Sequence, residues 1–264
     1  MKLLALALVL FLVPQDEKIT LKFNPRKGDK LNGTSKMELQ LKISVDMGEQ
    51  SQDIDFEQRG GSKKTIEYVD VENGKVTRLV IDTAEDYEEK KQPPTMEWNR
   101  TDNPMNGRKV TIFMKDGEIV REGTDGLKEK DLKKLDLSQG EAKFFPDKPV
   151  AVGDSWEVKG DAVREFINAR DEIKEASLKV KLKEVKEIDK RRCAIMSSVL
   201  EMSGKGDNEV SFSGKMDVEI VVWIDRGYLL SAKGKGKVTL KSDGEQMKLS
   251  GEGPMTIETT VKVE

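Results

Sequence analysis

The stretch that decides the fold runs from Phe144 to Val158 and reads FFPDKPVAVGDSWEV. A similar phrase, FNPRKGDK, runs from Phe23 to Lys30. In both phrases an aromatic residue precedes a proline, a basic residue follows, and a Gly-Asp pair leads into a strand. Proline prevents regular strand pairing and Gly-Asp favours a turn, so each phrase predicts a turn that opens a strand. We interpret the phrases as the openings of two related halves.

The longer phrase is expected to form a structural seam between these halves. Trp156 would anchor the following strand in the core, and we expect its side chain to be buried. The residues that we assign to the seam are Phe145, Pro146, Pro149, Gly153 and Trp156. The resulting division is a signal segment at 1–15, a first β half at 16–124, a helical connector at 125–142 and a second β half at 143–264, within one continuous domain.

Apolar and polar residues alternate with a period of two in both halves. From Met37 to Met47 every odd position is apolar. From Val210 to Ile224 every even position is apolar except Gly214. This period predicts long strands, each with one apolar face.

Turn signals separate the predicted strands. Asn73-Gly74 and Asp116-Gly117 predict two-residue hairpin turns, because these pairs tolerate the positive φ angles of a type I′ turn. Between them, the stretch 90–107 is rich in Pro, Asn and Asp and predicts a loop.

Two segments have helical rather than strand periodicity. They run from Asp125 to Leu137 and from Asp161 to Ile173, and both predict short amphipathic helices. A one-sided antiparallel sheet must cover its apolar face, and strands this long coil when a dozen of them pair. The sequence therefore predicts a mainly β (α+β) fold: a long-stranded, curved antiparallel sheet or half-barrel of two related halves, with two short helices near the middle.

The balance of charge disfavours a polyanionic partner. Charged residues make up 36% of the 264 residues, yet the net charge is only −3. A chain without a positive field gains little from phosphate backbones. We therefore expect no nucleic-acid partner.

The residue types also disfavour catalysis. The sequence contains no histidine, which removes Ser-His-Asp and Cys-His nucleophiles and the ordinary zinc sites. The acidic cluster from Asp82 to Glu89 could hold calcium, but its spacing fits no calcium loop and a solvated acidic turn is favoured. Cys193 has no base to activate it, so a half-buried strand cysteine is favoured over a nucleophile. We expect no enzyme activity, cofactor or metal.

Two further patterns leave alternatives open. Gly234 and Gly236 leave a gap on an apolar face, which either admits a helix or ligand or lets the sheet bend. Alternating lysines could form a basic stripe on the outer face, although a solvated face that pairs with nearby acids is favoured. These lysines are Lys179, Lys181, Lys183, Lys233, Lys235 and Lys237.

The N-terminal residues predict export. Lys2 is followed by an apolar run from Leu3 to Val13, which is too short to span a bilayer but fits the core of a signal peptide. The alternative is an uncleaved anchor, and we expect no other transmembrane span. The single cysteine cannot form an internal disulfide, which favours a periplasmic or extracellular protein of a bacterial envelope over a small disulfide-stapled domain.

The seam phrase carries a resemblance. From Phe145 to Trp156, with its counterpart from Phe23 to Asp29, the chain resembles bacterial exported β-rich proteins of unknown function, in which a P-x-K-P-V-x-V-G-D-x-W phrase opens a second half. In pattern it is also similar to half-barrel lipoprotein carriers and related lipid-binding envelope proteins, although no lipidated cysteine is present. That likeness implies a curved sheet around an apolar cavity and assigns no ligand contacts to individual residues.

Two functional classes stay open ahead of catalysis. The first is a non-enzymatic envelope protein that binds an apolar ligand or lipid in the concave face of its sheet. The second is a structural or protein-interaction module with a filled core, whose partner would be another envelope protein. For the first class, the expected ligand-binding residues lie on the apolar face: Phe212, Met216, Val218, Ile220, Val222 and Met247.

Overall fold

The period of two becomes strands that are mostly far longer than usual. The computed structural model describes residues 17–264 except 49, 139, 141–142, 167–172, 206–209 and 244–247, so the expected signal segment lies outside the described residues. The strands are β1 (Lys30–Met47), β2 (Gln50–Glu72), β3 (Lys75–Lys91), β4 (Trp98–Asp102), β5 (Arg108–Lys115), β6 (Glu118–Glu122), β7 (Ser155–Lys159), β8 (Ile173–Ile188), β9 (Arg191–Lys205), β10 (Ser211–Trp223), β11 (Tyr228–Asp243) and β12 (Lys248–Val263).

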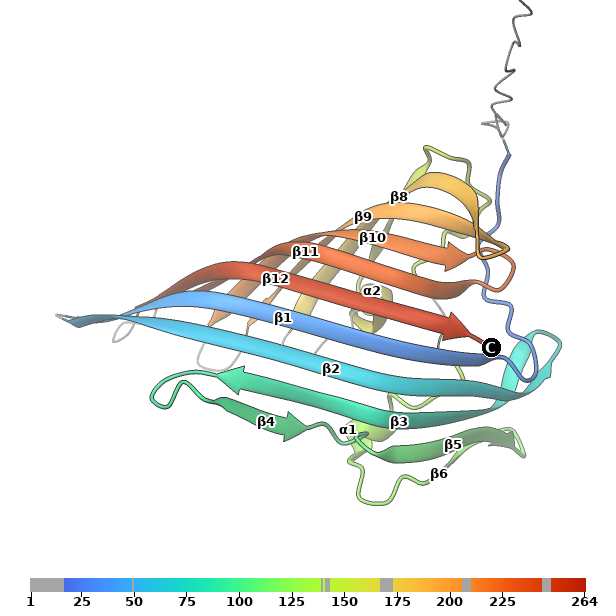
Figure 1. Cartoon of the computed structure of the whole chain (residues 1–264), viewed down its shortest axis with the longest axis horizontal. Helices are drawn as coiled ribbons and strands as arrows, with labels where there is room; N and C mark the ends of the chain where they lie inside the picture. Colours follow the sequence, from blue (N-terminus) through green and yellow to red (C-terminus); the bar gives the residue numbers. More distant parts are fainter. Residues whose placement is uncertain are drawn as a thin grey trace, which may run out of the picture.

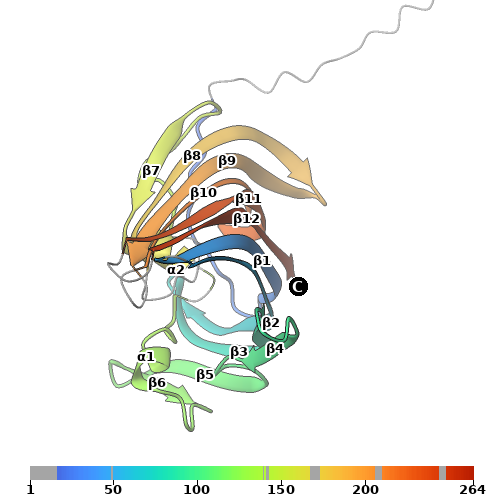
Figure 2. The ribbon, with the colours of Figure 1, turned by 90° about the vertical axis from the view of Figure 1, so that its left-hand side faces the viewer.

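These strands pair in one curved antiparallel sheet, as the sequence predicts (Figures 1 and 2). The order is β6-β5-β3-β2-β1-β12-β11-β10-β9-β8-β7, and β4 pairs with β3 beside this path. The chain therefore starts at the centre with β1, works outward to β6, crosses to the opposite edge at β7, and returns to the centre with β12.

The pairing of β1 with β12 merges the two halves. It runs from Leu31 opposite Val263 to Asp46 opposite Lys248, and is interrupted only near Pro254, which has no N–H to donate. At Gly253 the two backbones come so close that an added Cβ would lie 1.6 Å from the carbonyl oxygen of Gln40. Only glycine fits at this point of the join.

This close approach generates a test of the join. Gly253→Ala should lower the free energy of unfolding by about 1–3 kcal/mol, because β1 and β12 would have to separate to admit the methyl group. Gly33→Ala is the matched control in the same ladder, since the nearest atom to its Cβ would be 3.7 Å away. Urea unfolding of both variants measures the difference. Equal midpoints would show that the join tolerates a side chain.

The two Gly-Asp phrases form the same hydrogen-bonded turn. The N–H of Arg26 donates to Asp29 Oδ2 at 3.0 Å, and the N–H of Ala151 donates to Asp154 Oδ2 at 2.9 Å. The glycine before each aspartate has a positive φ, +88° in the first turn and +100° in the second. Each glycine N–H then binds a carbonyl of the second strand of its half, on β2 and β8 respectively. The relation between the complete halves stays a prediction.

The seam residues differ from expectation in one respect. Trp156 is half-buried rather than buried, and its Nε1 donates to the carbonyl of Phe144 at 2.8 Å. The reason is its place on β7, the edge strand, where no further strand covers it. Phe145 and Pro146 are also half-buried, whereas Pro149 and Gly153 are exposed. The fully buried aromatic of the seam is Phe144.

The two predicted hairpin turns are confirmed, because Asn73 and Asp116 both have φ of +53° and each precedes a positive-φ glycine. The predicted loop at 90–107 is wrong in part: it contains β4, which pairs with residues 87–91 of β3. Trp98 of β4 packs its ring under the Arg59 guanidinium, 4.2 Å from its centroid. The local composition of this stretch could not show that an arginine of another strand would pack on Trp98.

The two helices form where they are expected, although the described helical segments are shorter. They are α1 (Glu129–Leu132) and α2 (Asp161–Phe166). No helix among the described residues is long and apolar enough to cross a membrane.

Two hydrophobic clusters form on the apolar face of the sheet. In the second half, residues from outside the sheet fill the space over β8–β10, namely Ile19, Leu21, Phe144, Val150 and Val163. In the first half, Leu135 and Tyr228 pack with apolar side chains of β1, β2, β3 and β5. The hydroxyl of Tyr228 donates to Asp29 Oδ2 at 2.7 Å, which ties the first Gly-Asp turn to β11.

Candidate functional site

The expected ligand-binding residues divide between two environments. Met216, Val218, Ile220 and Val222 are at most 2% exposed, because the chain's own segments fill the space above them. Phe212, the second residue of β10, is half-buried and belongs to neither core cluster. Met247 lies outside the described residues. A ligand role for the four buried residues stays a prediction, on a surface that the core already occupies.

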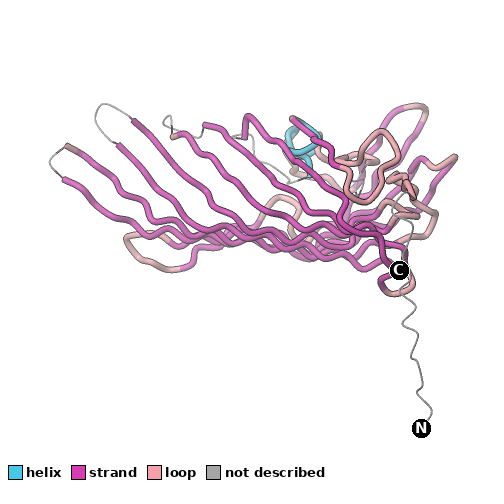
Figure 3. Tube along the Cα trace, turned by 90° about the horizontal axis from the view of Figure 1, so that it is seen from above, coloured by secondary structure: helices cyan, strands magenta, loops and turns pink. Residues whose placement is uncertain are grey.

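The apolar face continues well beyond these clusters. Figure 3 shows the long strands extending past α2 toward one end of the sheet, and the main contacts of α2 are with β7 and β8. Apolar side chains of five strands share this end, and none of them belongs to either core cluster. We call this surface the distal apolar face: Leu39, Leu41, Ile43, Val45, Ile54, Phe56, Phe212, Val238, Leu240 and Leu249.

The strand register brings these side chains into transverse rows. Ile54 of β2 lies opposite Ile43 of β1, and across β12 the row continues through Leu240 to Phe212. In this row β12 contributes Gly251, which adds no side chain between its neighbours. Apart from Leu41, Val45 and Val238, the members are half-buried, so the face presents part of its apolar area.

A polar step lies between the distal apolar face and the first-half core. On the same face of β2, the residues change from Phe56 through Gln58, Gly60 and Ser62 to Lys64 before the core begins at Ile66. Ser35 lies opposite Ser62, and its hydroxyl is 3.0 Å from that of Thr259. Along β1 and β2 this surface therefore passes from the Lys64 cation through polar side chains to hydrocarbon, and Asp86 of β3 lies opposite Ser62.

Lys64 is a functional candidate that the sequence analysis missed. Its side chain is accessible to solvent, but surrounding protein atoms lower the pKa of its ammonium by removing water, and Asp86 partly offsets this. Among the described residues, no carboxylate lies within salt-bridge distance of its Nζ. Extending the alternation of the strand backward from Ile66 would have placed Lys64 on the apolar face.

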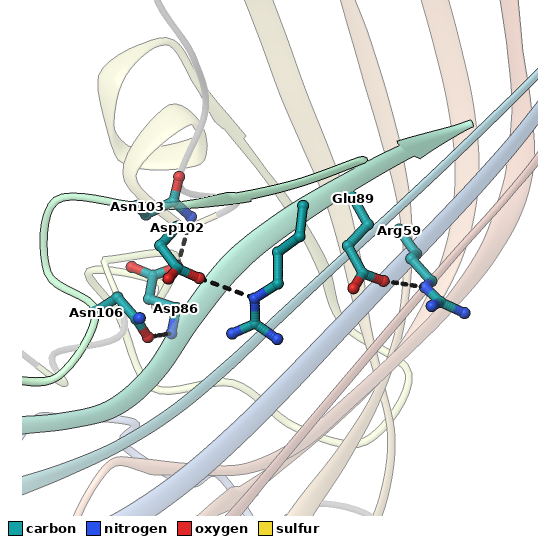
Figure 4. Close-up of polar contacts among 7 residues, drawn as sticks. Arg59, Asp86, Glu89, Asp102, Asn103 and Asn106 are labelled. Atoms are coloured by element: carbon teal, nitrogen blue, oxygen red, sulfur yellow. Dashed lines mark hydrogen bonds and ion pairs between the residues drawn. The ribbon is translucent and has the colours of Figure 1, made fainter. Parts of the chain in front are cut away.

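The carboxylate near Lys64 is that of Asp86, and two asparagines of the loop between β4 and β5 bind this residue (Figure 4). Asn103 Nδ2 donates to Asp86 Oδ1 at 2.6 Å, and the backbone N–H of Asp86 donates to Asn106 Oδ1 at 2.8 Å. Glu88, further along the same face of β3, pairs with Lys90 at 3.0 Å. The loop before β5 thus fixes the acidic side of the polar step.

The acidic cluster does not converge on a cation. It lies in strand β3, not in the solvated turn that the sequence favoured, and the alternation of the strand sends its carboxylates to opposite faces. Glu85 pairs with Lys63, and Glu89 pairs with Arg59 on the outer face. Among the described residues there is no group of three or more metal-ligating side chains.

The outer face carries both signs of charge. A shallow groove of about 1120 Å³ crosses β7–β12 and β1 there, and Lys179, Lys181, Lys233 and Lys235 line it beside acidic residues. Lys233 pairs with Glu258 at 2.9 Å, and the hydrogen bond and charge of Lys233 lower the pKa of that carboxyl. The expected pairing with acids is confirmed for Lys179 and Lys233, whereas the other four lysines of the predicted stripe have no ion pair among the described residues.

Two other sequence candidates have structural explanations. A Cβ on Gly234 would meet Met216 and Ile257, and one on Gly236 would meet the backbone of β10, so neighbouring strands occupy the gap. Cys193 is buried in β9, and burial raises the pKa of its thiol. A raised pKa disfavours the reactive thiolate.

No family model matches the chain, and no curated protein matches it. The resemblance to exported β-rich proteins therefore stays a prediction. Among solved structures, one that concerns lipid–protein interactions in lipovitellin is 10% identical, with a TM-score of 0.33 over 90% of this chain and 26% of that chain. A DUF1329 family protein from Desulfovibrio piger is also 10% identical, with a TM-score of 0.14 over 90% of this chain and 85% of that one. At these scores neither likeness bears on function.

Substitution by aspartate should have different effects in the filled core and on the distal apolar face. Val218→Asp should cost about 4 kcal/mol or more of unfolding free energy, because it buries an unpaired charge in a filled core. Ile54→Asp, at the half-buried distal face, should leave the fold intact, since the carboxylate can reach water there. Circular dichroism and urea unfolding measure both. A Val218→Asp variant with the unfolding free energy of the wild type would mean that the core is hollow.

Proposed function

We propose that this protein is a non-enzymatic, exported binding protein of the cell envelope, which holds the hydrocarbon part of a lipid on its distal apolar face. The observation that carries the proposal is the continuation of an apolar sheet face beyond both hydrophobic clusters. Soluble proteins rarely present a contiguous apolar patch of this kind without a partner for it. Export rests on the sequence of the N-terminal residues alone.

The shape of the site favours hydrocarbon over a compact ligand. Rows such as Ile54, Ile43 and Leu240 cross several strands, which gives a broad, elongated surface. Side chains on such a surface contribute by area, at about 25 cal/mol per Å² of apolar surface removed from water. An acyl chain supplies that area with no polar groups to desolvate.

A second candidate function is supported by the filled core that contains Val218 and Ile220. A module whose apolar face is largely filled by its own segments could serve to bind another envelope protein. Under that function the distal apolar face would bury a protein surface, and free lipid would have no site.

Binding of a fluorescent fatty-acyl probe distinguishes the two candidates. Wild type should bind it saturably, and Ile54→Asp should weaken binding about tenfold, the effect of losing about 1.4 kcal/mol of apolar contact. Ile119→Asp is the matched control, because Ile119 is an exposed isoleucine on edge strand β6. Folded wild type that binds no probe would refute the proposal, and unchanged binding by Ile54→Asp would place the ligand elsewhere.

A further inference from the structure

The polar step gives the candidate site a direction. Lys64 lies opposite Gly33 on β1, and Ser62 lies opposite Ser35. At about 3.3 Å per residue, Met37 begins about 13 Å further along β1 than Gly33, and Val45 lies about 40 Å along it. Along β1 and β2, a ligand aligned with the strands would thus meet the Lys64 cation, then hydroxyls, then hydrocarbon, with Asp86 and Glu88 of β3 beside the polar stretch.

The charges around Lys64 leave it available to a ligand. Glu88 is paired with Lys90, and the Asp86 carboxylate accepts from Asn103 at 2.6 Å. Asp86 lies outside the 4 Å limit for a salt bridge with Lys64, and the described residues offer Lys64 no other ion pair. Lys64 as a whole is an exposed residue. An anionic group could therefore bind the ammonium without displacing a protein partner.

We propose that Lys64 binds the anionic head group of the lipid, that the hydroxyls of Ser35, Ser62 and Thr259 face its polar linkage, and that its acyl chain extends toward the distal apolar face. This inference rests on the proposed function and narrows its ligand to an anionic glycerolipid. A plain fatty acid would place its first methylene groups on the hydroxyls, whereas a glycerol ester matches a polar stretch of about 10–15 Å before the hydrocarbon.

A matched pair of lipids tests the assignment. Monoacyl glycerophosphate and monoacylglycerol with the same acyl chain differ only in the phosphate, and both can be titrated below their micelle concentrations by calorimetry. Wild type should bind the phosphate form about tenfold more tightly, since the phosphate forms an ion pair with the Lys64 ammonium that monoacylglycerol cannot form. Raising the salt concentration should reduce this preference, because the site is open to solvent.

Lys64→Met should abolish the preference and leave monoacylglycerol binding unchanged, because methionine keeps an apolar stem and removes the charge. Lys63→Met is the matched control: Lys63 is the neighbouring residue, but it faces the outer side and pairs with Glu85 at 3.7 Å. The control should retain the preference. Thermal unfolding of both variants checks that any loss comes from the ligand contact.

Each contrary outcome identifies what has failed. If neither lipid binds to wild type, the proposed function fails. If both bind equally well, or if Lys64→Met keeps the preference, lipid binding stands and the role of Lys64 is refuted. If glycerol phosphate alone binds as tightly as the monoacyl glycerophosphate, the site recognises free phosphate and the assignment of a lipid is overturned.

Discussion

The structure depends on how a one-sided sheet of twelve strands covers its apolar face. Each half can donate only a few residues from outside the sheet, so Ile19, Leu21 and Phe144 cover the second half while Leu135 helps to cover the first. These segments lie toward one end of the long strands. The distal apolar face lies beyond both clusters of the described residues, where the long strands continue past α2.

The same constraint explains where polar groups appear on the inner face. Lys64 loses hydration to the surrounding protein atoms, which lowers the pKa of its ammonium, and the charge of Asp86 partly offsets this loss. Hydroxyls at Ser35 and Thr259 satisfy one another across β1 and β12. The inner face is thus divided into a filled part, a polar step and an open apolar part, whereas the outer face carries cross-strand ion pairs such as that of Lys233 with Glu258.

Much of the fold could be predicted from local sequence, because period two and the Asn-Gly and Asp-Gly pairs act within a few residues. β4 could not, since Trp98 depends on Arg59 from another strand. The burial of the β10 candidates could not be predicted for a related reason: alternation shows which face of Val218 is apolar, but not that Ile19 and Phe144 will pack in the same cluster. Lys64 was within reach, since it continues the alternation of Ile66 and Tyr68.

The central position of β12 has a consequence for how the chain is made. Thr34 and Thr260 hydrogen-bond to each other although they are 226 residues apart, and the whole join between the halves has similar separation. During synthesis β1 therefore stays unpaired on one side until β12 emerges, and this high contact order favours slow folding. A nascent chain of this topology remains without its finished sheet for most of translation, which is the state that a translocation machinery requires of a polypeptide that it threads through a membrane.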